Sequence, residues 1–131
     1  MRIIDARKKG LSIGQMDDDG LRYVCDQIIV RGAALYGCDM PQTEFFAEVL
    51  SKEFSDYLLD FGYDNLTLEE IILAMRMNAN GNFINPLGED INQTAFFGNF
   101  IHVSFLCKVL HGYMVLRNNL ETKFKNHIDG Y

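Results

Sequence analysis

Two adjacent carboxylates, Glu69 and Glu70, are the pair in this chain whose type and spacing could support acid–base chemistry. Each has a simpler explanation. Glu70 follows Thr67 by three residues, which is the spacing of a capping box, where each side chain bonds the other residue's backbone amide. Glu69 would lie in the first turn of the same helix, where a negative charge complements the helix dipole. We therefore interpret the pair as a helix start and expect no catalytic residues.

Residues that bind metals are present but lack the spacing of known sites. Asp17, Asp18 and Asp19 could begin a calcium loop, but its sixth and twelfth positions would be Arg22 and Ile28 instead of glycine and glutamate. The three histidines do not fall four residues apart, as they do on a zinc-binding helix: His102, His111 and His127. No P-loop, dinucleotide-binding or HExxH sequence occurs. The sequence therefore predicts no metal and no cofactor.

The cysteines indicate the cellular compartment of the protein, and its net charge argues against one class of ligand. Cys25, Cys38 and Cys107 are an odd number at wide spacing without a CxxC pair, which favours reduced thiols and a cytoplasmic location. The most apolar stretch, residues 96–116, is interrupted by polar and charged side chains and is not typical of a membrane span. A net charge of −6 argues against nucleic acid as the primary ligand, since phosphate contacts need a basic surface.

Helical periodicity of the apolar residues decides the fold class. It predicts an all-α protein, a single compact bundle of about four principal helices with a long C-terminal helix. The expected ranges are 18–36, 41–61, 67–79 and 101–126. Aspartates, Pro41 and Thr67 mark helix starts, and Gly37, Gly62 and Gly81 mark helix ends. Gly32, inside the first range, would weaken that helix slightly or let another backbone approach.

Two segments lie outside these helices. Residues 1–16 are expected to form an extended or mobile basic arm, with residues 17–131 as the helical domain. The arm would dock through four apolar residues: Ile3, Ile4, Leu11 and Ile13. It is read as a solvated terminus, with contact to nucleic acid as the alternative. The loop 82–96 is rich in Asn, Gly and Pro, which indicates turn chemistry, although long loops are often functional.

The C-terminal helix is long for the size of the domain. Over residues 101–126 it would span about 39 Å, at about 1.5 Å per residue. A domain of 131 residues has a radius of gyration of only about 14 Å. Leu120 and Phe124 continue the apolar stripe into the part that must fray, project or pack on another molecule. This pattern favours a partner surface there, including a homodimer through the C-terminal helix.

Two segments carry a resemblance to a known group of proteins. Residues 66–81 contain an EEI-x-x-A-x-R core, and residues 97–117 combine an aromatic–glycine pair with a helix ending in VL-x-x-Y-x-x-x-R. Together they resemble small helical proteins of bacterial phages and mobile elements, and more distantly the phage helicase loader and inhibitor proteins. The matching residues are Glu69, Glu70, Ile71, Ala74, Arg76, Phe97, Gly98, Val109, Leu110, Tyr113 and Arg117.

The resemblance implies a non-enzymatic module that binds a replication protein such as the replicative helicase. On that basis the residues expected to contact the partner are Glu69, Arg76, Tyr113 and Arg117. The two arginines could instead pair with the chain's own acids and support only the fold. Two other functions stay open: a small DNA-binding regulator that uses the basic arm and the Thr67 helix, and an enzyme or small-molecule binder with a pocket between the Phe-rich helices.

Overall fold

The computed structural model describes residues 2–93 and 101–129, with side chains described up to Leu120 of the last helix. Five α-helices follow one another, and a 3₁₀ turn, η1 (Ile13–Gln15), lies between the first two. They are α1 (Ile3–Ala6), α2 (Asp18–Tyr36), α3 (Glu44–Asp60), α4 (Leu68–Ala79) and α5 (Val103–Asp129). The described residues contain no strand beyond isolated bridges, so the predicted all-α fold is confirmed.

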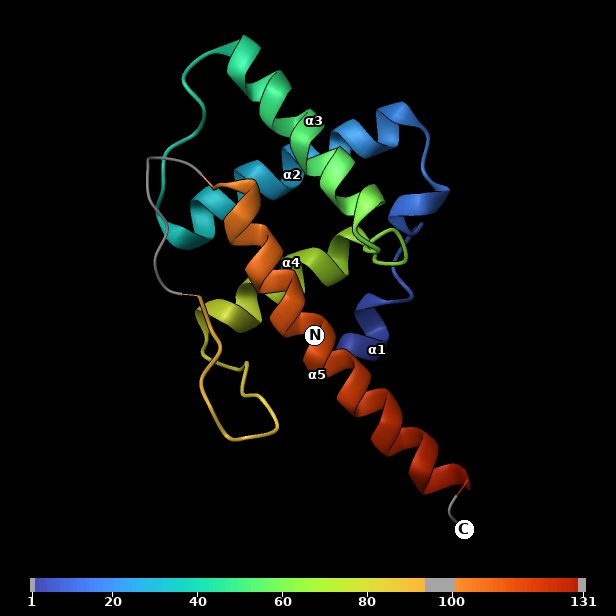
Figure 1. Cartoon of the computed structure of the whole chain (residues 1–131). Helices are drawn as coiled ribbons and strands as arrows, with labels where there is room; N and C mark the ends of the chain where they lie inside the picture. The colour runs from blue at the N-terminus through green and yellow to red at the C-terminus, as the bar shows by residue number, and fades with distance from the viewer. Residues whose placement is uncertain (1, 94–100, 130–131) are drawn as a thin grey trace.

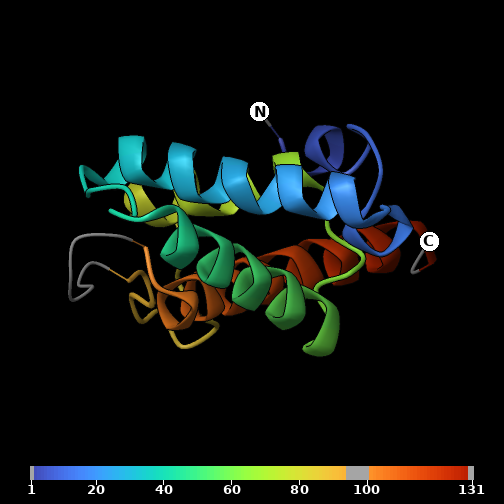
Figure 2. The same ribbon diagram turned by 90° about the horizontal axis from the view of Figure 1, so that it is seen from above.

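The helices form two layers around one core. Figure 2 shows α2 and α4, with α1 at one end, in the first layer, and α3 with α5 in the second. Helix α4 packs on α1, α2 and α5, and α3 packs on α2 and α5. In Figure 1 the C-terminal half of α5 extends beyond the other helices, as its predicted length required. Phe97, Gly98, the remainder of the predicted loop (94–96) and the side chain of Phe124 lie outside the described residues.

The capping box predicted at Thr67 is present and begins α4. The backbone N–H of Glu70 donates to Thr67 Oγ1 over 3.1 Å, and the N–H of Thr67 donates to Glu70 Oε1 over 3.4 Å. Every residue from 70 to 75 is buried, because α1, α2 and α5 cover different sides of this helix. An amphipathic helix would bury one face, so α4 is instead the central element of the bundle.

The starts of α2 and α3 are also capped by side chains. Asp17 Oδ1 accepts from the N–H of Gly20 over 2.8 Å, so α2 has the predicted bounds. Helix α3 was expected from residue 41 but begins at Glu44. The hydroxyl of Thr43 accepts from the N–H of Phe46 over 3.1 Å, which makes Thr43 the cap and leaves Pro41 outside the helix.

The N-terminal segment differs from the extended or mobile arm that the sequence predicted. It contains α1 and η1, and Ala6 and Ile13 are fully buried. Thr67 Oγ1 donates to the carbonyl of Ala6 over 2.8 Å, and the N–H of Ile13 donates to the carbonyl of Leu66 over 2.8 Å. The cap of α4 therefore also holds this segment. Ile4 and Leu11, which were also expected to dock, are exposed.

Asparagine side chains organise the described part of the loop after α4. Asn85 Oδ1 accepts from the N–H groups of Leu87 and Glu89. Asn92 Oδ1 accepts from the N–H of Phe83 over 2.9 Å. Buried Asn78 of α4 exchanges hydrogen bonds with the backbone of Gln93, which ties the end of the loop to the core. These contacts are the turn chemistry that the composition indicated.

Ile101, which lies just before α5, packs against α2 at Gly32. A Cβ atom added at Gly32 would lie 2.0 Å from Ile101 Cδ1, with Ile101 Cγ1 next at 3.4 Å. Ile101 is buried, so its terminal methyl group occupies the space that a side chain at residue 32 would need. The sequence suggested the approach of another backbone at Gly32, whereas the group that lies there is the side chain of Ile101.

This geometry predicts a rescue between two substitutions. Gly32→Ala should lower the free energy of unfolding by about 1–2 kcal/mol, because the overpacking outweighs the gain in helix propensity. Ile101→Val removes the clashing methyl group, so in that background Gly32→Ala should be neutral or stabilising. Urea unfolding of the two single variants and the double variant measures the coupling. Additive effects would contradict the proposed contact.

Candidate functional site

A buried carboxylate joins α4 to α5. Glu70 is fully buried, and its Oε2 accepts a 2.5 Å hydrogen bond from the hydroxyl of Tyr113. The same oxygen lies 3.6 Å from Nε of Arg117, of which only 5% is exposed. Its Oε1 accepts from the backbone N–H of Thr67. Positive charge and two donors thus surround the carboxylate, which is what burial of a charge requires.

The neighbouring carboxylate faces a different environment. Glu69 Oε1 lies 3.7 Å from Nη1 of Arg31 on α2, and both side chains are partly exposed. Glu69 and Glu70 therefore have separate partners on separate helices and do not face one space. This geometry agrees with the interpretation of the pair as a helix start, with an additional structural role for Glu70.

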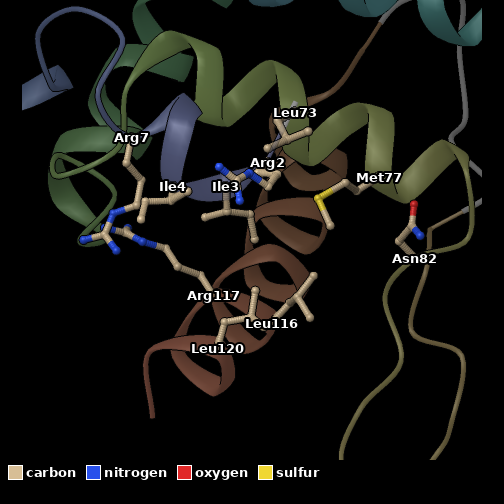
Figure 3. A pocket seen from close by; sticks show the side chains of 10 residues that line it. All are labelled: Arg2, Ile3, Ile4, Arg7, Leu73, Met77, Asn82, Leu116, Arg117 and Leu120. Carbon is tan, nitrogen blue, oxygen red and sulfur yellow. The ribbon is translucent and has the colours of Figure 1, made fainter. Parts of the chain in front are cut away.

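A cavity of about 660 Å³ lies beside this ion pair, where α1, α4 and α5 meet. Figure 3 shows its side chains: Arg7 and Arg117 extend together on one side, and Arg2 lies beside Ile3 among the apolar groups. We call this cavity the arginine-rimmed groove. Its lining comprises Arg2, Ile3, Ile4, Arg7, Leu73, Met77, Asn82, Leu116, Arg117 and Leu120. Arg117 belongs both to the groove and to the buried ion pair, so the core fixes one part of the rim.

The four residues predicted to bind a partner are distributed over the molecule. Arg117 lines the groove, and Tyr113 lies behind it with no exposed surface. Arg76 is exposed on α4 but does not line the groove, and Glu69 faces Arg31. Their role in partner binding stays a prediction. The structure brings together only Tyr113 and Arg117, through Glu70.

Most of the groove was missed by reasoning from the sequence. Arg2 and Arg7 were assigned to an arm without a fixed position, and Met77 was not singled out. The sequence did single out four residues that line it: Ile3 and Ile4 as docking residues, Arg117 as a partner contact, and Leu120, which continues the apolar stripe of the last helix past the point where the domain should end. Two further features are negative. Among the described residues, no three His, Cys, Asp or Glu side chains cluster as metal ligands would, and no helix is long and apolar enough to cross a bilayer.

The two adjacent glutamates predict a matched pair of stability effects. Glu70→Ala removes the partner of a buried arginine and should lower the free energy of unfolding by about 3–5 kcal/mol. Glu69→Ala breaks a partly exposed ion pair and should cost about 0–1 kcal/mol. Urea denaturation of both variants at pH 7 checks this difference. Equal effects would contradict the expectation that the buried contacts of Glu70 stabilise the fold more than the partly exposed ion pair of Glu69 does.

Alkaline pH should destabilise the protein through its buried tyrosines. Burial, and then the hydrogen bond to Glu70, raises the pKa of Tyr113 well above its usual range, and burial likewise raises the pKa of Tyr57. The pKa is higher in the folded state, so their contribution is complete below about pH 10, the pKa of an unfolded tyrosine, and is lost above it. Burial also raises the pKa of Cys25 from its ordinary value of 9.0 to about 12. The unfolded chain therefore releases this proton first, and the loss of stability begins near pH 9.

The measurement is the free energy of unfolding between pH 7 and 11. Each proton released only by the unfolded chain adds a slope of about 1.4 kcal/mol per pH unit. Tyr113→Phe should reduce the slope above pH 10, although it also lowers the stability at neutral pH. An unchanged slope in this variant would remove Tyr113 from the explanation.

The chain was compared with known proteins at three levels. Scans against protein-family models, curated protein sequences and solved structures found no match. The function must therefore be inferred from the residues and geometry described above.

Proposed function

We propose that this chain is a non-enzymatic protein-interaction module that docks a partner in the arginine-rimmed groove. The observation that carries the proposal is the combination of an apolar floor with a cationic rim. Leu73, Met77 and Leu116 supply apolar surface from α4 and α5, and Arg2 and Arg7, which flank α1, supply charge. Interfaces of proteins that bind one another combine these features, with arginine among the residues that contribute most to affinity.

The occupant that fits this chemistry is an acidic amphipathic helix of the partner. Such a helix inserts apolar side chains, spaced three to four residues apart, into a groove between helices. Its acidic residues would meet the guanidinium groups at the rim, which bind carboxylates through two parallel hydrogen bonds. Charge complementarity therefore favours an acidic ligand over a basic or a neutral one.

The exposed ion pair at the rim can be replaced by one with a ligand. Arg2 Nε lies 3.3 Å from Asp5 Oδ2, and both side chains are substantially exposed. An exposed pair of this kind contributes little free energy, so a carboxylate of the ligand can replace Asp5 at small cost. Arg117 is nearly buried beside Glu70, and its position is therefore fixed before a ligand arrives. A side chain that is already in place lowers the entropy that binding loses.

The identity of the partner is proposed from the sequence. Residues 66–81 and 97–117 resemble small proteins of phages and mobile elements. They resemble more distantly the phage helicase loader and inhibitor proteins, which bind the replicative helicase, so a replicative helicase is the first partner to test. The compartment that we propose is the cytoplasm, where the three free cysteines would stay reduced.

Binding to a defined acidic helix tests the proposal. The probe is a synthetic 15-residue peptide with Leu at helical spacing and Glu at the flanking positions, compared with a scrambled peptide of the same composition. Leu120→Asp should weaken binding at least tenfold, since it puts a carboxylate in the groove where the ligand brings its own. Leu120 is 45% exposed, so the substitution should leave the fold intact.

Leu87→Asp is the matched control, because Leu87 is 83% exposed in the loop and does not line the groove. Fluorescence anisotropy gives both affinities, and the same pair of variants is then tested on the purified helicase of the host. Three outcomes would overturn the proposal: equal affinity for the scrambled peptide, equal effects of the two substitutions, or binding only of a long-chain fatty acid. The last would favour a small-molecule binder.

A further inference from the structure

The first half of α3 presents an acidic amphipathic surface, which borders His102 and Val103 at the start of α5 on the side of Val49. Phe45 is 77% exposed, and Val49, one turn later on the same face, is also exposed. Glu44 and Glu48 are exposed and occupy the adjacent positions of the helix. We call these four residues the α3 knob. An exposed aromatic side chain beside a second apolar residue is typical of a surface that binds another protein.

The α3 knob has the chemistry that the arginine-rimmed groove requires. It offers two apolar side chains four residues apart, as a helix that lies in a groove does. Its two carboxylates have the same spacing and the sign opposite to that of Arg2 and Arg7 at the rim. The knob and the groove are thus complementary in both apolar surface and charge.

The two surfaces cannot meet within one molecule. Helix α3 packs on α2 and α5, whereas the groove lies between α1, α4 and the C-terminal half of α5. Figure 1 shows the start of α3 at the top of the molecule and α1 with the end of α5 at the bottom. Any α3 knob that enters the groove must therefore come from a second copy.

We propose that this chain associates head to tail, with the α3 knob of one copy seated in the arginine-rimmed groove of the next. The inference rests on the proposed function, because it assigns a second copy of this chain to the same groove. The sequence suggested self-association through the C-terminal helix. The proposed contact uses that helix, since Leu116 and Leu120 of α5 line the groove. The contact joins two different surfaces, so an open assembly keeps a free knob at one end and a free groove at the other.

Head-to-tail contact has a regulatory consequence. The α3 knob and an acidic partner helix compete for one groove, so partner binding would stop the growth of the assembly at that end. Self-association would in turn lower the apparent affinity for the partner as the concentration of the chain rises. The salt dependence should be the same for both, since the same arginines meet carboxylates in each case.

Two substitutions separate the surfaces. Phe45→Asp disables the knob but keeps the groove, and Leu120→Asp disables the groove but keeps the knob. Both side chains are exposed enough that the fold should survive. Phe61→Asp is the control, because Phe61 is an exposed phenylalanine at the other end of α3. Circular dichroism and thermal unfolding first establish that all three variants are folded.

Sedimentation velocity over a hundredfold range of concentration then measures association. The wild-type chain and Phe61→Asp should grow in mass with concentration, and Phe45→Asp and Leu120→Asp alone should stay monomeric. An equimolar mixture of these two variants should form a 1:1 dimer and nothing larger, because the one intact knob fits the one intact groove. A symmetric dimer through either surface cannot give this result.

A monomeric wild-type chain, a mixture that does not pair, or an association lost in only one of the two variants would each overturn the inference. The proposed function is tested separately on the Phe45→Asp variant, whose groove is intact. If this variant binds the acidic synthetic peptide while the wild-type chain stays monomeric, only the self-association is wrong. A peptide of residues 42–56 should bind Phe45→Asp and not Leu120→Asp.

Discussion

Burial of the Glu70 carboxylate is the constraint on which the arrangement of this fold depends. A charge removed from water needs donors and an opposite charge, and these come from separate parts of the chain. Thr67 supplies its backbone N–H, Tyr113 its hydroxyl and Arg117 its positive charge. Satisfying one carboxylate therefore fixes the start of α4 and its register against α5. Because Thr67 also bonds Ala6, the same cluster sets the position of α1.

The groove is a product of this cluster. Its walls come from both ends of the chain, with Ile3 and Arg7 on one side and Leu116 and Leu120 on the other. These residues meet only because α4 holds α1 and α5 together. Arg117 takes part in both structures, so the charge at the rim is coupled to the electrostatics of the core. This coupling gives the acidic ligand that we propose a rigid anchor at Arg117.

Local patterns in the sequence were sufficient for most of the fold and for little of the site. The bounds of α2 and the capping box of Thr67 and Glu70 depend on neighbours within four residues, so they could be predicted. The second role of Glu70 depends on Tyr113, which is 43 positions away, and no local pattern encodes such a distance. The N-terminal segment was misjudged for the same reason: its anchor, Thr67, lies 61 positions from Ala6.

The brevity of α1 has a consequence for the dynamics of the molecule. A helix of four residues is far too short to be stable by itself, so it persists only through its docking on α4. Segments with so few anchors detach at a lower free energy than the whole domain unfolds. Helix α1, which forms one wall of the arginine-rimmed groove, can thus detach while the remaining helices keep their packing. Amide exchange should be fastest in this segment, and a bound helix that bridges α1 and α5 would close it like a clasp.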